Sequence, residues 1–330
     1  MLTPVLRCAI GLAAVAAAFP AMGQAPLRFA TYVNEVDARY KGFQKFAELA
    51  EKKTAGRVKM QIFGSGTLHA FDKAIESVNA GVSDISAVVA AAIDKRLPCA
   101  NITHFLPMPV DWERHPELDR EYNELLKDEF AKQGLVAVHS SNFSYDQEWW
   151  FRTPVDRVDD LKGRLVRSVA PVTTHIIRKW GGKPVFIAPT EVYQSAERGV
   201  VEGVNMGVAT FSSWKLWNVM PYMVNAKLFY GNVMYSMGKR KFDALSAQDQ
   251  ASVKEAGYEA AKWVKPVYEN WINEQVGNAV LRIGASVNSL PKAERVRLAQ
   301  SAGEGWNNQI EEACGPLAPK VRALFKKYEG

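Results

Sequence analysis

One arginine, Arg167, has the setting of a residue that binds an anion. It closes the run VDDLKGRLVR at 158–167, in which a polar turn leads into a short apolar strand. A guanidinium is planar, permanently charged and forked, so an arginine held on a strand can bind both oxygens of a carboxylate. The run therefore predicts a carboxylate-binding arginine. The competing interpretation is a surface salt bridge.

Further candidates for a ligand pocket lie in the segments that precede and follow this strand. They are polar or aromatic, and comprise Gln147, Trp149, Arg152, Phe211 and Trp214. An aromatic wall beside a guanidinium would hold the organic body of an acid while the charge holds its carboxylate. Strand alternation places Trp149 and Trp150 on opposite faces, so at most one of them can face a ligand. The alternative is that these rings belong to the hydrophobic core.

The sequence lacks the residue patterns that are typical of enzymes. It contains no GxSxG, HExxH, Walker or GxGxxG motif, and no CxxC pair. The five histidines are scattered, and His139, which ends an apolar segment, is more readily a structural residue. We therefore expect no catalytic site, no metal site and no cofactor. A secreted hydrolase is kept as an alternative.

The N-terminal residues indicate export. Residues 1–25 contain one basic residue, Arg7, then an apolar stretch from Cys8 to Phe19 and several small residues, as in a cleaved signal peptide. We therefore expect a periplasmic protein. Its formal net charge of +6 comes from basic residues interspersed with acidic ones, so we expect no nucleic-acid partner.

Two cysteines, Cys99 and Cys314, follow the expected signal peptide. An oxidising compartment permits a disulfide between them. Two buried thiols that act as small hydrophobic residues are the alternative, because the long separation in sequence says nothing about proximity. Both interpretations stay open at this point.

Alternating strands and helices must position the candidate residues. Segments 27–32, 57–63 and 85–89 have the pattern of strands, and segments 37–54 and 71–81 between them have that of amphipathic helices. This β-α-β-α-β order predicts a mostly parallel sheet flanked by helices.

Part of that pattern recurs downstream, which favours two similar α/β lobes. A strand at 185–187 precedes a helix from Thr190 to Gly199, and the residues after Gly199 resemble those after Gly81. Two facing lobes would form a ligand cleft at the carboxyl ends of their strands. A long helical segment, 246–277, with Pro266 in its interior, is expected to kink and to cross both lobes.

Several short motifs resemble those of one family over nearly the whole exported chain. They are FAT at 29–31, EKKTAGRV at 51–58, GTL at 66–68, DLKG at 160–163 with Arg167, and PTEVY through GVVEG at 189–203. Together they resemble the extracytoplasmic solute receptors of tripartite ATP-independent periplasmic (TRAP) transporters. The resemblance implies a two-lobe periplasmic-binding-protein fold, joined by hinge strands and the long helix. Lobe I would comprise 26–144 and about 232–272, and lobe II 145–231 and about 273–330.

The resemblance also implies roles for single residues. In that family the arginine that matches Arg167 binds the ligand carboxylate, and the segment that matches Asn205 adds a polar contact. Members often carry a second basic residue upstream of the arginine. Here that neighbourhood contains Gln147, with Arg152 slightly later, so a second carboxylate clamp is in doubt. Members that hold a metal usually have an acidic-aromatic pair where this chain has Val204-Asn205-Met206, which argues against a bound metal.

The expected function is therefore a monomeric receptor that delivers a small organic acid to a TRAP membrane permease. On the lobe I side, the residues placed to line the cleft are Tyr32, Asn34, Phe71 and Val88. One arginine and several aromatic residues favour a monocarboxylate with an apolar or aromatic body. A ligand-presenting sensor subunit of a receptor kinase is a further alternative.

Overall fold

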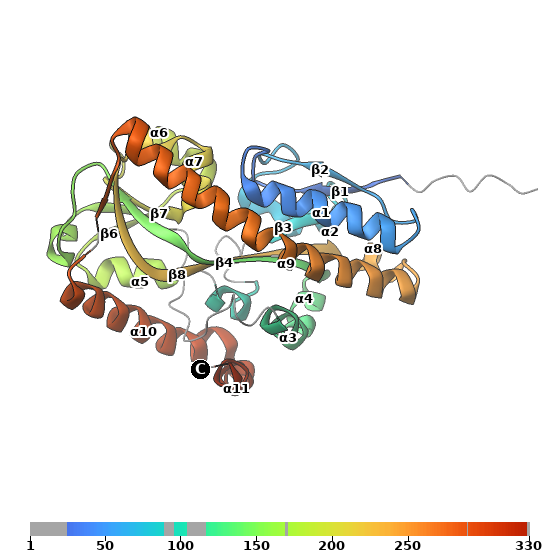
Figure 1. Ribbon diagram of the computed structural model, residues 1–330. Coiled ribbons are helices and arrows are strands. Elements are labelled where there is room, and N and C mark those ends of the chain that lie inside the picture. Colours follow the sequence, from blue (N-terminus) through green and yellow to red (C-terminus); the bar gives the residue numbers. More distant parts are fainter. Residues whose placement is uncertain (1–24, 89–95, 104–116, 169–170, 289, 329–330) are drawn as a thin grey trace, which may run out of the picture.

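The computed structural model describes residues 25–88, 96–103, 117–168, 171–288 and 290–328 (Figure 1). Residues 1–24 of the predicted signal peptide lie outside this part. The chain forms two lobes on one nine-stranded sheet with the order β2-β1-β3-β8-β4-β7-β5-β6, and β9 pairs with β8. The predicted α/β fold with two lobes is confirmed.

Lobe I is built around a parallel arrangement in which β1 lies between β2 and β3. Phe43 and Phe46 of α1 pack on Phe29 of β1, with ring centroids 5.3 and 6.1 Å apart. These buried rings hold the helix on the sheet. The elements are β1 (Leu27–Ala30), α1 (Ala38–Lys53), β2 (Met60–Phe63), η1 (Phe71–Lys73), α2 (Ala74–Asn79), β3 (Ile85–Val88) and α8 (Lys239–Asp243).

Lobe II repeats this arrangement, with β5 between β6 and β7 and parallel to both. Its own apolar cluster includes Trp150, Val204 and Phe211. The elements are η4 (Val158–Leu161), β5 (Leu165–Ser168), α5 (Pro171–Lys179), β6 (Lys183–Phe186), η5 (Pro189–Glu191), α6 (Val192–Glu197), β7 (Gly203–Gly207), α7 (Val208–Ser213) and η6 (Leu216–Asn218).

The junction between helix and strand is the same in both lobes, as the similar segments after Gly81 and Gly199 suggested. Both glycines adopt the left-handed conformation, with φ of 71° and 73°. In lobe I the Asp84 carboxylate accepts from the backbone N–H of Arg28 at 2.8 Å. In lobe II the Glu202 carboxylate accepts from that of Leu165 at 3.0 Å. The two lobes are therefore structural repeats.

Two long antiparallel strands carry the sheet from one lobe into the other: β4 (Leu135–Phe151) and β8 (Tyr222–Gly238). The expected lobe boundaries, 144/145 and 231/232, fall inside these strands. The sheet is therefore continuous, and each half combines parallel strands with an antiparallel one. The pairing of β4 with β8 is irregular near Phe143 and Gln147.

The predicted long helix is α9 (Ala247–Asn278), and it crosses both lobes in front of the sheet (Figure 1). The Ser246 side chain caps it by accepting from the Asp249 N–H at 3.1 Å. It contacts α1 of lobe I and α7 of lobe II. Pro266 lies inside it, and the helix continues into a π-helical turn at Ala279–Ile283.

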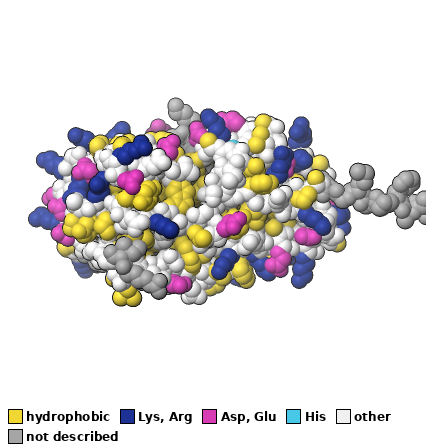
Figure 2. Space-filling model, turned by 90° about the horizontal axis from the view of Figure 1, so that it is seen from above, with side chains coloured by type: hydrophobic (Ala, Val, Ile, Leu, Met, Phe, Trp, Pro, Cys, Tyr) yellow, Lys and Arg dark blue, Asp and Glu magenta, His cyan; other side chains and the backbone are white. Residues whose placement is uncertain are grey.

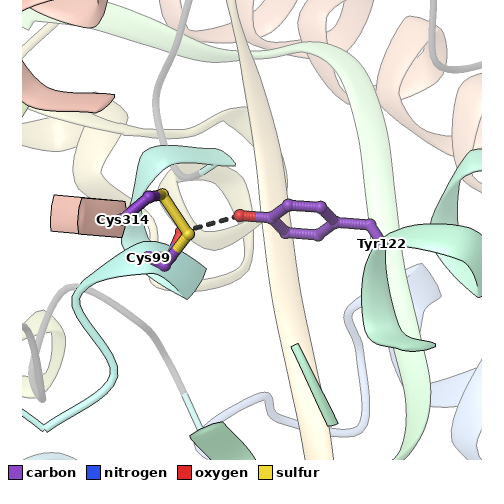
Figure 3. Close-up of a disulfide and its surroundings, with 3 residues drawn as sticks. All are labelled: Cys99, Tyr122 and Cys314. Atoms are coloured by element: carbon purple, nitrogen blue, oxygen red, sulfur yellow. Dashed lines mark hydrogen bonds between the residues drawn. A yellow bond between two sulfur atoms is a disulfide. The ribbon is translucent and has the colours of Figure 1, made fainter. Parts of the chain in front are cut away.

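The C-terminal residues, expected in lobe II, contact both lobes. α10 packs on α5 in lobe II and on η3, and α11 packs on α3 of lobe I. A disulfide joins Cys99 of η3 to Cys314 at the end of α10, and the Tyr122 hydroxyl donates to the Cys99 carbonyl at 2.6 Å (Figure 3). The open question about these cysteines is thus settled in favour of a bridge. The remaining elements are η3 (Cys99–Thr103), α3 (Glu117–Leu125), α4 (Lys127–Lys132), β9 (Ser286–Asn288), α10 (Lys292–Cys314), η8 (Gly315–Leu317) and α11 (Ala318–Lys327).

Candidate ligand-binding site

The two lobes meet where the parallel strands of each end. The segment after β1 leads into α1 in lobe I, and β7 leads into α7 in lobe II. Arg39 Nη2 donates to the Thr210 hydroxyl across this junction at 2.6 Å. The Asn34 amide also crosses it and donates to the Ser213 carbonyl at 3.4 Å. Carboxyl ends of parallel strands are where open α/β sheets bind ligands, so this junction is the candidate site.

Arg167 lies near the end of β5 and is only 2% exposed. Its Nε donates to the Ile187 carbonyl at 3.0 Å, and its Nη1 donates to the Asn205 carbonyl at 2.7 Å. No acidic side chain pairs with it among the residues that the structure describes. Burial lowers the pKa of Arg167 to about 9, although interaction with Tyr32 opposes the shift. The guanidinium is therefore still charged at neutral pH.

Tyr32 and Phe71 form an aromatic pair on the lobe I side of the junction. Their ring centroids lie 5.3 Å apart in an edge-to-face arrangement, and both rings are half-buried. Tyr32 follows β1 and Arg167 lies near the end of β5, so both come from the carboxyl ends of parallel strands. That they bind one ligand together stays a prediction.

Asn205 is buried in β7, and its backbone carbonyl accepts from Arg167. It pairs with Trp149, so its side chain lies on the face of the sheet opposite to that of Arg167. Its side-chain amide donates to the Glu148 carbonyl at 3.1 Å, and its amide oxygen has no hydrogen-bond partner among the described residues. A buried acceptor without a donor is unfavourable. An N–H or O–H group of a ligand would satisfy it. The predicted polar contact from this residue stays a prediction.

Trp149 lies on the opposite face of the sheet from Arg167. Arg167 pairs with Val204, and Val204 pairs with Trp150, so these three side chains share a face and Trp149 points away from it. Trp149 packs against Trp180 with ring centroids 4.9 Å apart and is 2% exposed. The expectation that Trp149 lines the ligand site is therefore corrected: it is a core residue.

Phe211 and Trp214 do not form an aromatic wall at the cleft either. Phe211 is fully buried, stacks on Trp150 at 3.7 Å and meets Trp217 edge-to-face at 4.9 Å. Trp214 is half-buried at the end of α7 and packs against the same cluster. These rings hold α7 on the sheet, which corrects their expected role in binding.

Arg152 lies at the wrong end of the strands to bind with Arg167. It follows Phe151, which pairs with Gly203 at the start of β7, whereas Arg167 donates to Asn205 further along that strand. Its Nη1 donates instead to the Ala196 carbonyl at the end of α6, at 2.6 Å. The arginine therefore stabilises a helix terminus.

In the part of the chain that it describes, the structure gives no ligand-facing contact for the three remaining predicted residues, Val88, Gln147 and Asn34. Val88 ends β3 and is 1% exposed in the lobe I core, so we do not retain it as a contact. The backbone of Gln147 pairs with Gly207, and its side chain lies outside the described part of the structure. Asn34 is half-buried and makes the cross-lobe contact given above.

Sequence reasoning missed the group formed by Asp37, Arg39 and Thr210. Asp37 caps α1 by accepting from the Arg39 N–H at 2.9 Å, which the sequence pattern of a helix start could have suggested. The contact with Thr210 joins residues that are far apart in the chain. No local pattern predicts it.

His139 is a structural residue, as its sequence context suggested. It is 2% exposed, stacks on Phe46 at 5.3 Å and places Nδ1 2.8 Å from the Gly257 carbonyl. Burial lowers its pKa to about 4, although the hydrogen bond to Gly257 opposes the shift. The imidazole is therefore neutral at pH 7.

Other features of the described residues were considered as sites. A groove of about 480 Å³ lies between α3, α4, β4 and α9, but ion pairs such as Arg120–Glu255 and Lys127–Glu124 neutralise charges along it. No group of three His, Cys, Asp or Glu side chains in this part of the chain is arranged to hold a metal. No helix there is long and apolar enough to cross a membrane. Basic and acidic side chains are interspersed on the face shown in Figure 2.

Solved structures share this architecture. DctP7 of Bordetella pertussis, an extracytoplasmic solute receptor that binds pyroglutamic acid, has a TM-score of 0.83 and 22% identity, covering 92% of this chain and 100% of that chain. A TRAP periplasmic solute binding protein from Desulfovibrio salexigens with bound orotic acid has a TM-score of 0.86 and 19% identity, covering 93% and 99%. One from Roseobacter denitrificans with bound β-D-glucuronate has a TM-score of 0.80 and 22% identity, covering 92% and 99%.

Relatives are also found by sequence. The 2,3-diketo-L-gulonate-binding periplasmic protein YiaO of Escherichia coli is 24% identical over 247 residues, 72% of this chain and 73% of that protein. An uncharacterized protein of Haemophilus influenzae is 27% identical over 258 residues, 78% of each. Residues 29–313 match the DctP family, described as bacterial extracellular solute-binding protein, family 7. The match covers most of the chain, which therefore belongs to this family of bacterial extracellular solute-binding proteins.

Proposed function

We propose that the chain is a periplasmic receptor that closes its lobes on a small organic acid and delivers it to the membrane subunits of a TRAP transporter. The observation that carries the proposal is the buried Arg167 guanidinium, which pairs with two carbonyls and with no acidic side chain among the described residues. Burying a charge without a counter-charge costs free energy. The carboxylate of a ligand supplies that counter-charge.

The remaining contacts come from residues around Arg167. Nε and Nη1 are engaged by carbonyls, which leaves Nη2 for the ligand. Tyr32 and Phe71 supply an aromatic surface from lobe I, and Asn34 a polar group.

A ligand held by Arg167 of lobe II and Tyr32 of lobe I stabilises the closed arrangement. It shifts the population of closed molecules by its difference in affinity for the open and closed forms. Closure also removes water, which strengthens the pairing of Arg167 with the carboxylate. The permease then recognises the surface that closure creates.

The chemistry of the cleft favours a ligand with one carboxylate. Pyroglutamic acid, orotic acid and β-D-glucuronate, the ligands of the similar structures, support an organic acid. The expected aromatic or apolar body has lost the support of Trp149 and Phe211, because both are core residues. It now rests on the pair of Tyr32 and Phe71.

A thermal-shift panel tests the proposal on the purified exported protein. Small organic acids are compared with their uncharged amides at one ionic strength, and each hit is measured by calorimetry. A ligand bound only by the folded form raises the melting temperature. We expect stabilisation by acids and none by the matching amides. A panel in which no acid stabilises the protein contradicts the proposal.

The transport step has its own test. Membrane subunits of a TRAP transporter are placed in vesicles with an ion gradient across the membrane. Uptake of the labelled acid is followed with and without the receptor. Uptake that requires the receptor supports the proposal. Receptor-independent uptake argues against it. Light scattering of the purified protein checks the expectation that it is a monomer.

A further inference from the structure

A second buried guanidinium, that of Arg39, lies at the lobe I side of the same junction. It is 4% exposed, and its central carbon lies 5.9 Å from the centre of the Tyr32 ring. Its Nη2 reaches Thr210 at the start of lobe II's α7. Arg167 donates to the Asn205 carbonyl of β7, the strand that leads directly into α7. Two buried guanidinium groups, one from each lobe, therefore contact the segment formed by β7 and α7.

Arg39 already holds a carboxylate, that of Asp37. Nε donates to Oδ1 at 2.9 Å and Nη2 donates to Oδ2 at 2.5 Å, so the pairing is bidentate. Asp37 is 1% exposed, and its Oδ1 also accepts from the Arg39 N–H at the start of α1. This is the geometry in which an arginine binds the carboxylate of a ligand. Asp37 thus occupies the two nitrogens of Arg39, Nε and Nη2, that a second carboxylate would use.

We propose that Asp37 determines the specificity of the site, by occupying its second cation with a carboxylate of the chain itself and so excluding dicarboxylates. This inference rests on the proposed function and names its ligand class. A dicarboxylate would have to displace Asp37, which would leave that carboxylate buried without a partner. If it did not displace Asp37, its second carboxylate would lie beside a like charge. In either case the affinity of the site for a dicarboxylate is lowered.

The Asp37→Asn variant tests the proposal. Asparagine has the shape of aspartate and keeps the oxygen that caps α1, so the change removes the charge with little change in shape. Arg39 then carries an uncompensated charge at the cleft. Its contact with Thr210 does not involve Asp37 and is retained.

Calorimetry at one ionic strength compares three matched pairs, which also belong to the panel of acids: succinate with succinamate, glutarate with glutaramate, and phthalate with phthalamate. In each pair the second compound has an amide in place of one carboxylate. We expect the wild-type protein to prefer the compound with one carboxylate. In Asp37→Asn the ratio of affinities shifts toward the dicarboxylate by about tenfold or more, which is about 1.4 kcal/mol.

The Asp37→Asn/Arg39→Met double variant is the matched control. It removes both charges of the pair, so it should keep the wild-type preference. A shift of about tenfold or more toward the dicarboxylate in this variant overturns the proposal, because it would not need Arg39. This result does not require Asp37→Asn to fold.

Two further outcomes also overturn it: an unchanged ratio in Asp37→Asn that is folded by circular dichroism, and a wild-type protein with no preference for the compound with one carboxylate. In both cases acids still bind and the proposed function stands. A wild-type protein that binds no acid of the panel defeats the proposed function itself, and this inference with it.

Discussion

Each lobe carries one buried arginine that contacts the segment formed by β7 and α7, and the two arginines differ in which groups compensate their charge. Burial acts to lower the pKa of Arg39, but the attraction of Asp37 and Tyr32 outweighs it and raises this pKa well above its usual value. Burial dominates at Arg167 and lowers its pKa to about 9. Asp37 compensates the charge of Arg39, whereas no acidic side chain among the described residues compensates that of Arg167. We infer that the first belongs to the fold and the second to the ligand.

The largest expected effect comes from removing the arginine that has an internal partner. Arg39→Met leaves the Asp37 carboxylate buried without its counter-charge, so the free energy of unfolding should fall by about 3–5 kcal/mol. Urea denaturation followed by circular dichroism measures it. The Asp37→Asn/Arg39→Met double variant should recover most of the loss. If Arg39→Met were as stable as the wild type, Arg39 would not be an arginine that the fold requires, and the proposed difference from Arg167 would be wrong.

His139 extends the comparison to a buried base that the fold keeps neutral. Its folded-state pKa of about 4 lies below the ordinary value of 6.5. As the pH falls, the unfolded chain therefore binds a proton first, and stability should fall from about pH 6.5 down to about pH 4, by about 3 kcal/mol in total. Denaturation at several pH values measures this loss. In His139→Gln the loss over this window should be smaller, and an identical profile would exclude His139 as its source.

Replacing Arg167, which has no acidic partner among the described residues, should affect binding more than folding. Arg167→Met should lower the affinity for the acid at least about tenfold, because loss of a buried charge pair costs about 2 kcal/mol or more. Its stability should change by less than about 1 kcal/mol, because relief of charge burial offsets the lost hydrogen bonds to Ile187 and Asn205. Calorimetry and melting of the same samples measure both quantities. Arg178→Met, an exposed arginine of α5, is the control and should change neither. Unchanged affinity in Arg167→Met would remove Arg167 as the anchor.

The smallest expected effect concerns the contact between the lobes. Thr210→Val keeps the shape of the side chain but removes the hydroxyl that accepts from Arg39, a loss of about 1 kcal/mol. We expect every acid to bind about fivefold more weakly, with the ratio between acids unchanged, and spin labels on the two lobes should report a larger open population. Ser213→Ala is the control, because Asn34 contacts only the backbone carbonyl of Ser213. A change in the ratio between acids would mean that Thr210 contacts the ligand.

Much of the fold could be predicted because its signals are local. The glycines at 81 and 199 end their helices in the left-handed conformation, as predicted. Ser246 begins the long helix, and Arg167 lies on a short strand. Each of these signals depends on a few neighbouring residues, whose backbone preferences and hydrogen bonds act before the chain is packed.

The aromatic part of the candidate site was predicted less well. The sequence indicates that a ring is buried, but it does not show whether the ring packs in the core or against a ligand. Trp149, Phe211 and Trp214 have the size and spacing of pocket residues, but they pack in the cores of the lobes. The alternation rule limited the choice to one of Trp149 and Trp150. The pairing of β4 with β7, and of β7 with β5, was needed to show which face carries Arg167.

By itself the sequence determined the two α/β lobes, the crossing helix and a charged residue at the end of a strand, because hydrophobic periodicity and turn chemistry act over short distances along the chain. Only the tertiary structure decided which charges have partners. The pair of Asp37 and Arg39 reaches Thr210, 171 residues beyond Arg39, and Cys99 bonds to a residue 215 positions away. Such contacts depend on how the lobes pack, and the free energy of a buried charge depends on that packing more than on its neighbours in sequence.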